Sequence, residues 1–152
     1  MAQVRESCDG DLKLLAPRLR AADLRELEAH KADAETALRH GLKVSRPCYT
    51  IEHEGRPIGM FGVAPHPVVP SVGIVWLLGS DEIGAKDVRV RFLRESRKWL
   101  DKISESFDLL CNLVHEDNTL HIKWLRFLGF TFIKQDPPFY EFVRINTCAT
   151  PQ

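Results

Sequence analysis

Residues 108–145 read DLLCNLVHEDNTLHIKWLRFLGFTFIKQDPPFYEFVRI, and this stretch decides the fold. The mostly apolar run Leu109–Val114 is typical of a buried strand. Asn118 can cap a helix over Thr119–Leu128, and Gly129 is a natural residue to end that helix. Two further strands complete the unit, Thr131–Gln135 and Phe139–Ile145. The stretch is therefore predicted to be a strand–helix–strand unit that ends in a strand pair.

A long helix and a group of antiparallel strands precede this unit. Asp87 is expected to cap a helix that runs to about Phe107, with apolar residues near a 3.6-residue period along one side. The arginine and lysine side chains of this helix are interpreted as a solvated face. Val72–Leu78 is apolar on both faces, as a central strand should be. The strands Cys48–His53 and Ile58–Val63 are predicted to form a hairpin.

The first 45 residues are predicted to be mostly helical after an edge strand at Ala2–Ser7. Helices are expected over Leu12–Leu19, from a cap at Asp23, and over Asp33–Leu42. The chain shows neither an internal repeat nor a linker, so one domain over residues 1–145 is expected. Residues 146–152 are predicted to form a frayed tail.

Composition narrows the classes of function that the chain can serve. Lys plus Arg equals Asp plus Glu, 21 against 21, so the formal net charge is zero and the basic excess of a general nucleic-acid binder is lacking. No apolar run approaches the roughly 20 residues that span a bilayer, and the polar N-terminus has no secretory signal. The 4 cysteines are scattered and are expected to be free thiols in a reducing compartment.

The helix in residues 118–130 carries a resemblance to a known family. Its pattern Asn118-x-x-His121-x-x-x-Leu125-x-x-x-Gly129-Phe130 resembles the Asn-x-x-Ala-x-x-x-Tyr-x-x-x-Gly-Phe pattern of the GCN5-related N-acetyltransferases (GNAT). The order of elements is also similar to that family. The resemblance implies an α+β fold layered α/β/α, with a mixed, mostly antiparallel central sheet, flanking helices and a β–α–β unit at the C-terminal end.

Four segments resemble a small family of proteins from tailed phages, described as internal virion proteins or as acetyltransferase-like. They are Val75–Asp81, Phe92–Ser96, His121–Phe132 and Pro138–Arg144. This resemblance implies a protein of the host bacterial cytoplasm or of the phage virion. Its expected partners are a host protein or other virion proteins.

The GNAT resemblance implies acetyl-CoA as cofactor and a phosphate-binding loop before the long helix. The loop departs from the family pattern, since Asp81 replaces a cation or amide and Lys86 replaces the second glycine. Asp81 and Glu82 should repel phosphate, and Lys86 should offset part of that repulsion. A plain strand-to-helix loop is the alternative interpretation. The residues expected to hold the cofactor are Leu77, Leu78, Gly79, Gly84, Ala85, Lys86, Asn118 and Trp124.

The catalytic groups of the family are only partly matched. Leu125 stands where the family often has a tyrosine that protonates the departing thiolate. Two residues are candidates for the general base: His115, just past the strand Leu109–Val114, and Glu52 on the hairpin. A solvated histidine at a strand end is the alternative for His115. Cys111 could act as a nucleophile but is more simply a small buried side chain. No metal is assigned, because Cys111, His115 and His121 lack zinc-ligand spacing.

Three functions remain open from the residues. The first is acetyl transfer from acetyl-CoA to an amine, such as a lysine or N-terminus of a host protein. The second is a catalytically inactive internal virion or host-interaction protein that keeps the fold. The third is a regulator that binds CoA without turnover.

Overall fold

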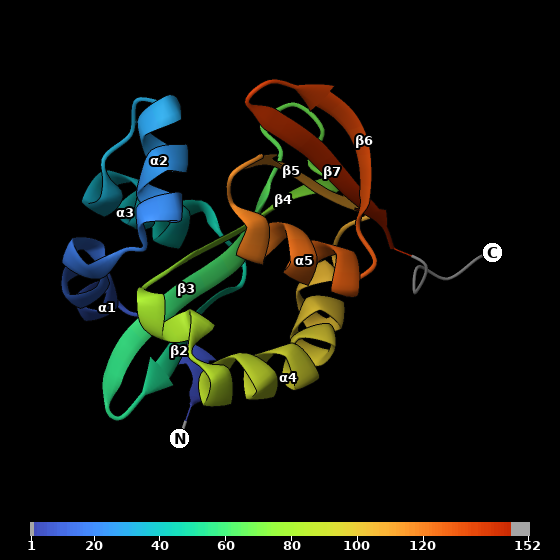
Figure 1. Ribbon diagram of the computed structural model, residues 1–152. Helices are drawn as coiled ribbons and strands as arrows, with labels where there is room; N and C mark the ends of the chain where they lie inside the picture. The colour runs from blue at the N-terminus through green and yellow to red at the C-terminus, as the bar shows by residue number, and fades with distance from the viewer. Residues whose placement is uncertain (1, 147–152) are drawn as a thin grey trace.

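The computed structural model describes residues 2–146, which form one sheet of seven strands in the order β1-β2-β3-β4-β5-β7-β6 (Figure 1). The strands are β1 (Gln3–Glu6), β2 (Cys48–His53), β3 (Arg56–Pro65), β4 (Val72–Gly79), β5 (Leu109–His115), β6 (Thr131–Asp136) and β7 (Phe139–Ile145). The helices are α1 (Asp9–Leu15), α2 (Ala21–Ala29), α3 (Ala34–Val44), α4 (Lys86–Ser104) and α5 (Thr119–Phe127), with the 3-10 turns η1 (Ala16–Arg18) and η2 (Asp81–Gly84).

The sheet separates two layers of helices, each with its own apolar core. Helices α1–α3 cover one face, and α4 and α5 cover the other (Figure 1). Side chains of β4 point alternately to the two faces of the sheet and so enter both cores. Val75 and Leu77 pack with α4 and α5, whereas Trp76 and Leu78 pack with α1 and α3. The predicted layered α+β fold is therefore confirmed.

The predicted strand–helix–strand unit is confirmed with nearly the expected bounds. Gly129 ends α5 with a φ of +89°, a conformation that favours glycine. Asp33, predicted as the first residue of a helix, caps α3 by accepting a hydrogen bond from the Thr36 N–H. Among residues 2–146, none of the helices combines the length and apolar character needed to span a bilayer.

Four local predictions differ from the structure. Residues 79–86 contain the turn η2, and α4 begins at Lys86 instead of after a cap at Asp87. Asp23 lies within α2 and is fully buried, so its carboxylate serves other partners. Asn146, predicted to fray, is buried because its side-chain amide donates hydrogen bonds to the Ser104 and Phe107 carbonyls. The rest of the predicted tail, 147–152, lies outside the described residues.

The strands β4 and β5 are the only parallel neighbours among the described strands, and they soon part. They pair only where Val72–Ile74 of β4 face Leu109–Cys111 of β5. Beyond that point the side-chain amide of Asn112 donates to the Val75 carbonyl at 2.8 Å. The remaining halves of both strands diverge, so the sheet has an opening where the two helical layers can meet.

Candidate active site

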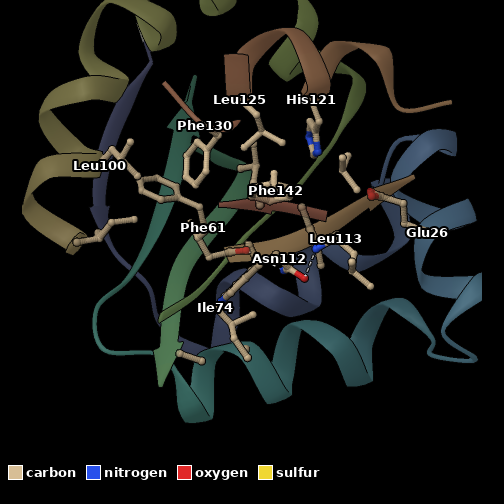
Figure 2. A pocket seen from close by; sticks show the side chains of 18 of the residues that line it. Glu26, Phe61, Ile74, Leu100, Asn112, Leu113, His121, Leu125, Phe130 and Phe142 are labelled. Atoms are coloured by element: carbon tan, nitrogen blue, oxygen red, sulfur yellow. Dashed lines mark hydrogen bonds between the residues drawn. The ribbon is translucent and has the colours of Figure 1, made fainter. Parts of the chain in front are cut away.

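A cavity of about 420 Å³ lies where β4 and β5 separate (Figure 2). Both helical layers contribute to its wall, with Glu26, His30 and Gly41 from the α2–α3 side and Phe92, Trp99 and Trp124 from the α4–α5 side. Its volume falls within the range of small-molecule sites. The cavity is therefore lined from both faces of the sheet.

Glu26 of α2 is the carboxylate in the cavity wall. Its Oε1 accepts from the backbone N–H of His115 at 3.0 Å, and its Oε2 accepts from the Asn118 amide at 2.9 Å. Burial raises the pKa of Glu26, and these two N–H donors counteract part of the rise. A carboxylate that is held in place and whose pKa is raised by burial accepts a proton more readily than a carboxylate in solvent.

A second carboxylate, Asp23, lies one turn earlier on α2 and is bound differently. Its Oδ2 accepts from the Gly79 N–H at 2.9 Å, and its Oδ1 lies 3.4 Å from the Arg20 guanidinium. The charge on Asp23 is therefore neutralised by Arg20, whereas Glu26 lacks an equivalent cation in its bonds.

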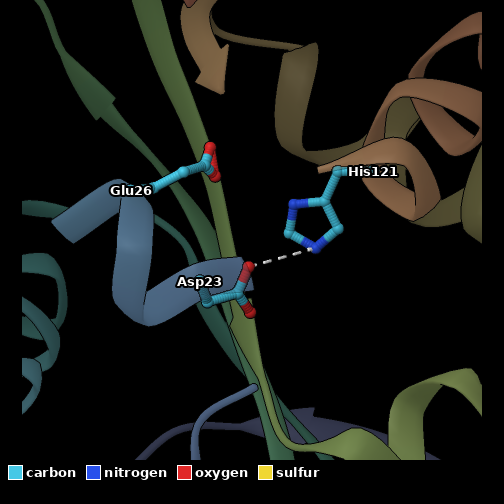
Figure 3. A group of neighbouring side chains, drawn as sticks. All are labelled: Asp23, Glu26 and His121. Carbon is cyan, nitrogen blue, oxygen red and sulfur yellow. Dashed lines mark ion pairs between the residues drawn. The ribbon is translucent and has the colours of Figure 1, made fainter. Parts of the chain in front are cut away.

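His121 of α5 completes this buried polar cluster from the opposite layer (Figure 3). Its Nε2 lies 2.9 Å from Arg20 Nη1, and its Nδ1 lies 3.1 Å from the Asn118 amide nitrogen. Burial lowers the pKa of His121 from 6.5 to about 4, against the attraction of Asp23. His121 is thus neutral near pH 7, and its hydrogen bond with Arg20, the residue before α2, joins α5 to α2.

Asp23, Glu26 and His121 also bring three metal-ligating atoms within 4.8 Å of one another. Arg20 already places a guanidinium beside Asp23 and His121, so the positive charge of the cluster comes from the protein. We therefore describe the group as a hydrogen-bonded polar cluster. Residue spacing alone missed it, because its members come from helices that are distant in sequence.

The predicted cofactor residues fall in two places. Leu77, Leu78 and Trp124 line the cavity. Gly79 lies at the end of β4, where its N–H is bound to Asp23. Gly84 ends η2 and the exposed Ala85 and Lys86 begin α4, outside the cavity wall. Asn118 is 1% exposed and lies at the cap position of α5, but its side chain binds the polar cluster instead of the helix end.

Neither predicted general base lines the cavity. Glu52 lies in β2, where its carboxylate pairs with Arg5 at 3.0 Å. The His115 ring accepts from the Asp117 N–H at 3.1 Å and packs edge-on against Phe139, at 5.6 Å between ring centroids. The link of His115 to the cavity is its backbone N–H, which holds Glu26.

Leu125 and the cysteines were the other residues that the sequence analysis considered for chemistry. Leu125 lines the cavity and is buried, so the tyrosine position of the family is apolar here. Burial raises the pKa of the Cys111 thiol, which disfavours the nucleophilic thiolate. Cys8, Cys48 and Cys111 are free thiols, and Cys148 lies outside the described residues.

A protein-family model described as "Bacteriophage T7, probable scaffold protein Gp13" matches residues 69–136. This range extends from just before β4 to the end of β6. The match supports the predicted likeness to proteins of tailed phages. No curated protein matches the chain.

Solved structures of acetyltransferases share the architecture. The GNAT domain of S. lividans PAT has a TM-score of 0.69 at 15% identity, covering 95% of this chain and 90% of that chain. A GCN5-related N-acetyltransferase from Kribbella flavida has a TM-score of 0.67 at 19% identity, with 95% and 97% coverage. This is the GNAT fold. PaiA N-acetyltransferase from Thermoplasma acidophilum, solved with coenzyme A, has a TM-score of 0.65 at 14% identity and covers 95% and 99%.

The residues around the opening fit a cofactor of the CoA type. In the cavity wall, the indole N–H groups of Trp99 and Trp124 are buried without an acceptor in the described part of the chain. Carbonyl oxygens of a pantetheine arm could supply such acceptors. The α4 helix starts at Ala85 without a side-chain cap, and a Cβ at Gly84 would meet only Leu120, at 3.6 Å. An open helix start beside a glycine is suited to a diphosphate.

The acidic character of the η2 loop is weaker than the sequence suggests. Glu82 forms ion pairs with Arg18 and with Arg56, the latter at 2.8 Å. These partners come from η1 and β3, so the sequence of the loop could not reveal them. Asp81 and Asp87, the latter in the first turn of α4, therefore remain as exposed acids that oppose a phosphate, and Lys86 lies nearby on the chain.

Proposed function

We propose that this protein is an N-acetyltransferase that moves the acetyl group of acetyl-CoA to an amine. One observation carries the proposal: the cavity crosses the sheet at the parting of β4 and β5 and has Glu26, a carboxylate with a raised pKa, in its wall. The proposal is supported by PaiA N-acetyltransferase, a protein of the same fold that was solved in complex with coenzyme A. The phage likeness suggests an acceptor on a host or virion protein.

Glu26 has the role of general base in this proposal, in place of His115 or Glu52. An amine nitrogen attacks only after it gives up a proton. Burial raises the pKa of Glu26, which favours its taking that proton, and the two N–H donors fix the position of its carboxylate. His115 and Asn118 are positioning residues, since they reach the amine only through Glu26. Glu52 is left with a structural role beside Arg5.

The cofactor would be held at two places. Leu77, Leu78 and Trp124 would contact the pantetheine arm in the cavity, and the open start of α4 with Lys86 would face the diphosphate. When bound, acetyl-CoA supplies an activated thioester from which the acetyl group passes to the amine. Leu125 carries no proton donor, so the departing sulfur would be protonated from solvent.

Isothermal titration of the full chain with acetyl-CoA and CoA tests the proposal first. Micromolar binding of both, followed by acetylation of a generic amine such as a lysine peptide, is the expected result. Absence of binding at millimolar cofactor would overturn the proposal. Glu26→Gln should retain binding and lose transfer, which separates the base from the cofactor site.

A second candidate function is a structural or scaffold protein that has kept the fold and lost the chemistry. Two observations favour it. The carboxylate of Asp23 accepts the hydrogen bond of the Gly79 N–H at the end of β4, so this N–H is not available to a ligand. The family model that matches residues 69–136 describes a probable scaffold protein. The same titration decides between the two, because a scaffold has no need for CoA affinity. In that case the protein would act inside the phage particle or during its assembly.

A further inference from the structure

The two ends of the cavity differ in chemistry. Figure 2 shows Glu26 and His121 toward one end, Leu100 and Phe130 toward the other, and Asn112 between them. The first end carries the polar cluster. The second end is apolar and lies under α4, between that helix and the sheet.

The apolar end is built from residues that belong to the core. Its walls are each between 3% and 6% exposed: Phe61, Leu100, Ile103, Phe130 and Phe142. Protein cores are normally packed without voids, and an unfilled cavity lowers stability. A cavity that extends into these core side chains is therefore better explained by an apolar ligand group that fills it.

Helix α4 brings two uncharged polar groups to this part of the wall, the Ser96 hydroxyl and the Trp99 indole N–H, and the indole N–H is buried without an acceptor in the described part of the chain. Ser96 of α4 lines the cavity, and its hydroxyl donates to the Leu93 carbonyl of its own helix at 2.9 Å. Leu125 adds a further apolar wall where the family often has a tyrosine. A ligand group there would find apolar contacts and no charge to pair with.

We propose that the site takes an acyl group longer than acetyl, a saturated chain of about four to six carbons. This inference rests on the proposed function and names the donor class for the same site. The chain would extend from the opening near Asn112 toward Leu100, while the amine approaches from the Glu26 end. An acyl group with a terminal carboxylate, such as succinyl, would be rejected because its charge would be buried without a partner.

Titration of the full chain with acetyl-, butyryl-, hexanoyl- and succinyl-CoA tests this. Each methylene that enters the apolar end should tighten binding about threefold to fourfold, and succinyl-CoA should bind less tightly than butyryl-CoA. Acetyl-CoA binding as tightly as hexanoyl-CoA would overturn the chain-length proposal and leave the acetyltransferase proposal standing. Failure of every CoA ester to bind would overturn both.

A matched pair of variants at Ser96 guards against nonspecific binding of the longer esters. Ser96→Leu adds volume to the cavity wall, so the affinity ratio of hexanoyl-CoA to acetyl-CoA should fall about tenfold. Ser96→Ala removes the same hydroxyl without adding volume, and its ratio should stay close to that of the unchanged chain. Equal ratios in the two variants would contradict a binding site at the apolar end. Circular dichroism confirms that each variant is folded before the ratio is read.

Discussion

The side-chain amide of Asn118 donates a 2.9 Å hydrogen bond to Glu26 from the position that would otherwise cap α5. An asparagine at a helix start usually turns its side chain back onto the helix. Here Arg20 donates to the Asn118 carbonyl oxygen at 3.0 Å, which holds the amide toward α2. A residue that resembles a family helix cap thus links two helical layers across the opening in the sheet.

Substitution of Glu26 by glutamine should abolish most transfer without harming the fold. We expect kcat/KM to fall about 100-fold or more, because a general base contributes that order of magnitude. A raised pKa means that the fold disfavours the ionised form, so stability falls as pH rises through the folded pKa. Glutamine removes this buried charge but can accept from only one of the two N–H donors of His115 and Asn118, so the thermal unfolding temperature at pH 7 should change little. The exposed Glu28→Gln on the same helix is the control and should change neither quantity.

Stability should depend on His121 in mildly acid solution. Its pKa is lowered from 6.5 to about 4, so between these values the unfolded chain takes up a proton that the fold refuses. Above pH 6.5 the free energy of unfolding carries no penalty from His121. As the pH falls from 6.5 toward 4, this free energy decreases by up to about 3 kcal/mol. Glu26 acts in the opposite direction, because its protonation relieves a buried charge.

Urea unfolding from pH 7 to pH 4 isolates the His121 contribution by comparison with His121→Gln. In His121→Gln, the free energy of unfolding should fall less steeply from pH 7 to pH 4, because the part of the slope due to His121 is missing. The exposed His40→Gln should keep the full slope. An identical slope in all three chains would mean that His121 is not held neutral by the cluster.

Reversal of charge at the start of α4 should weaken CoA binding. Lys86→Glu places a carboxylate beside the open helix start, and we expect a loss of about tenfold in affinity at low salt. The loss should shrink in 1 M salt, since exposed charges are then screened. Lys98→Glu, about 18 Å along the same helix, is the control. Equal effects of the two variants would place the diphosphate elsewhere.

Alanine substitutions at two glycines should change the free energy of unfolding in opposite directions. A Cβ at Gly62 in β3 would lie 2.7 Å from the Pro47 carbonyl oxygen, and this backbone atom cannot move aside easily. Gly62→Ala should lower the free energy of unfolding by about 2 kcal/mol. A Cβ at Gly10 in α1 meets nothing within 4 Å, so Gly10→Ala should raise it by about 0.5 kcal/mol or more. Chemical denaturation of both variants checks the pair.

Local patterns in the sequence determined most of the elements and their order. The alternation and apolar runs of Cys48–His53, Val72–Leu78 and Leu109–Val114 predicted three strands correctly, because a strand depends on a few adjacent side chains. Gly129 marked the end of α5 for an equally local reason, its positive φ. The neutral charge balance, 21 basic against 21 acidic residues, needs no structure at all.

The candidate site was decided only by the tertiary structure. Arg20 and Asn118 are 98 residues apart, and no periodicity connects Glu26 of α2 with His121 of α5. Their meeting depends on where the parallel pairing of β4 and β5 stops, because the gap beyond it lets the two layers touch. Burial in that gap then raises the pKa of Glu26 and lowers that of His121. Desolvation is a property of the packed chain, so sequence reasoning, which gave His115 and Glu52 as candidate bases, could not single out Glu26.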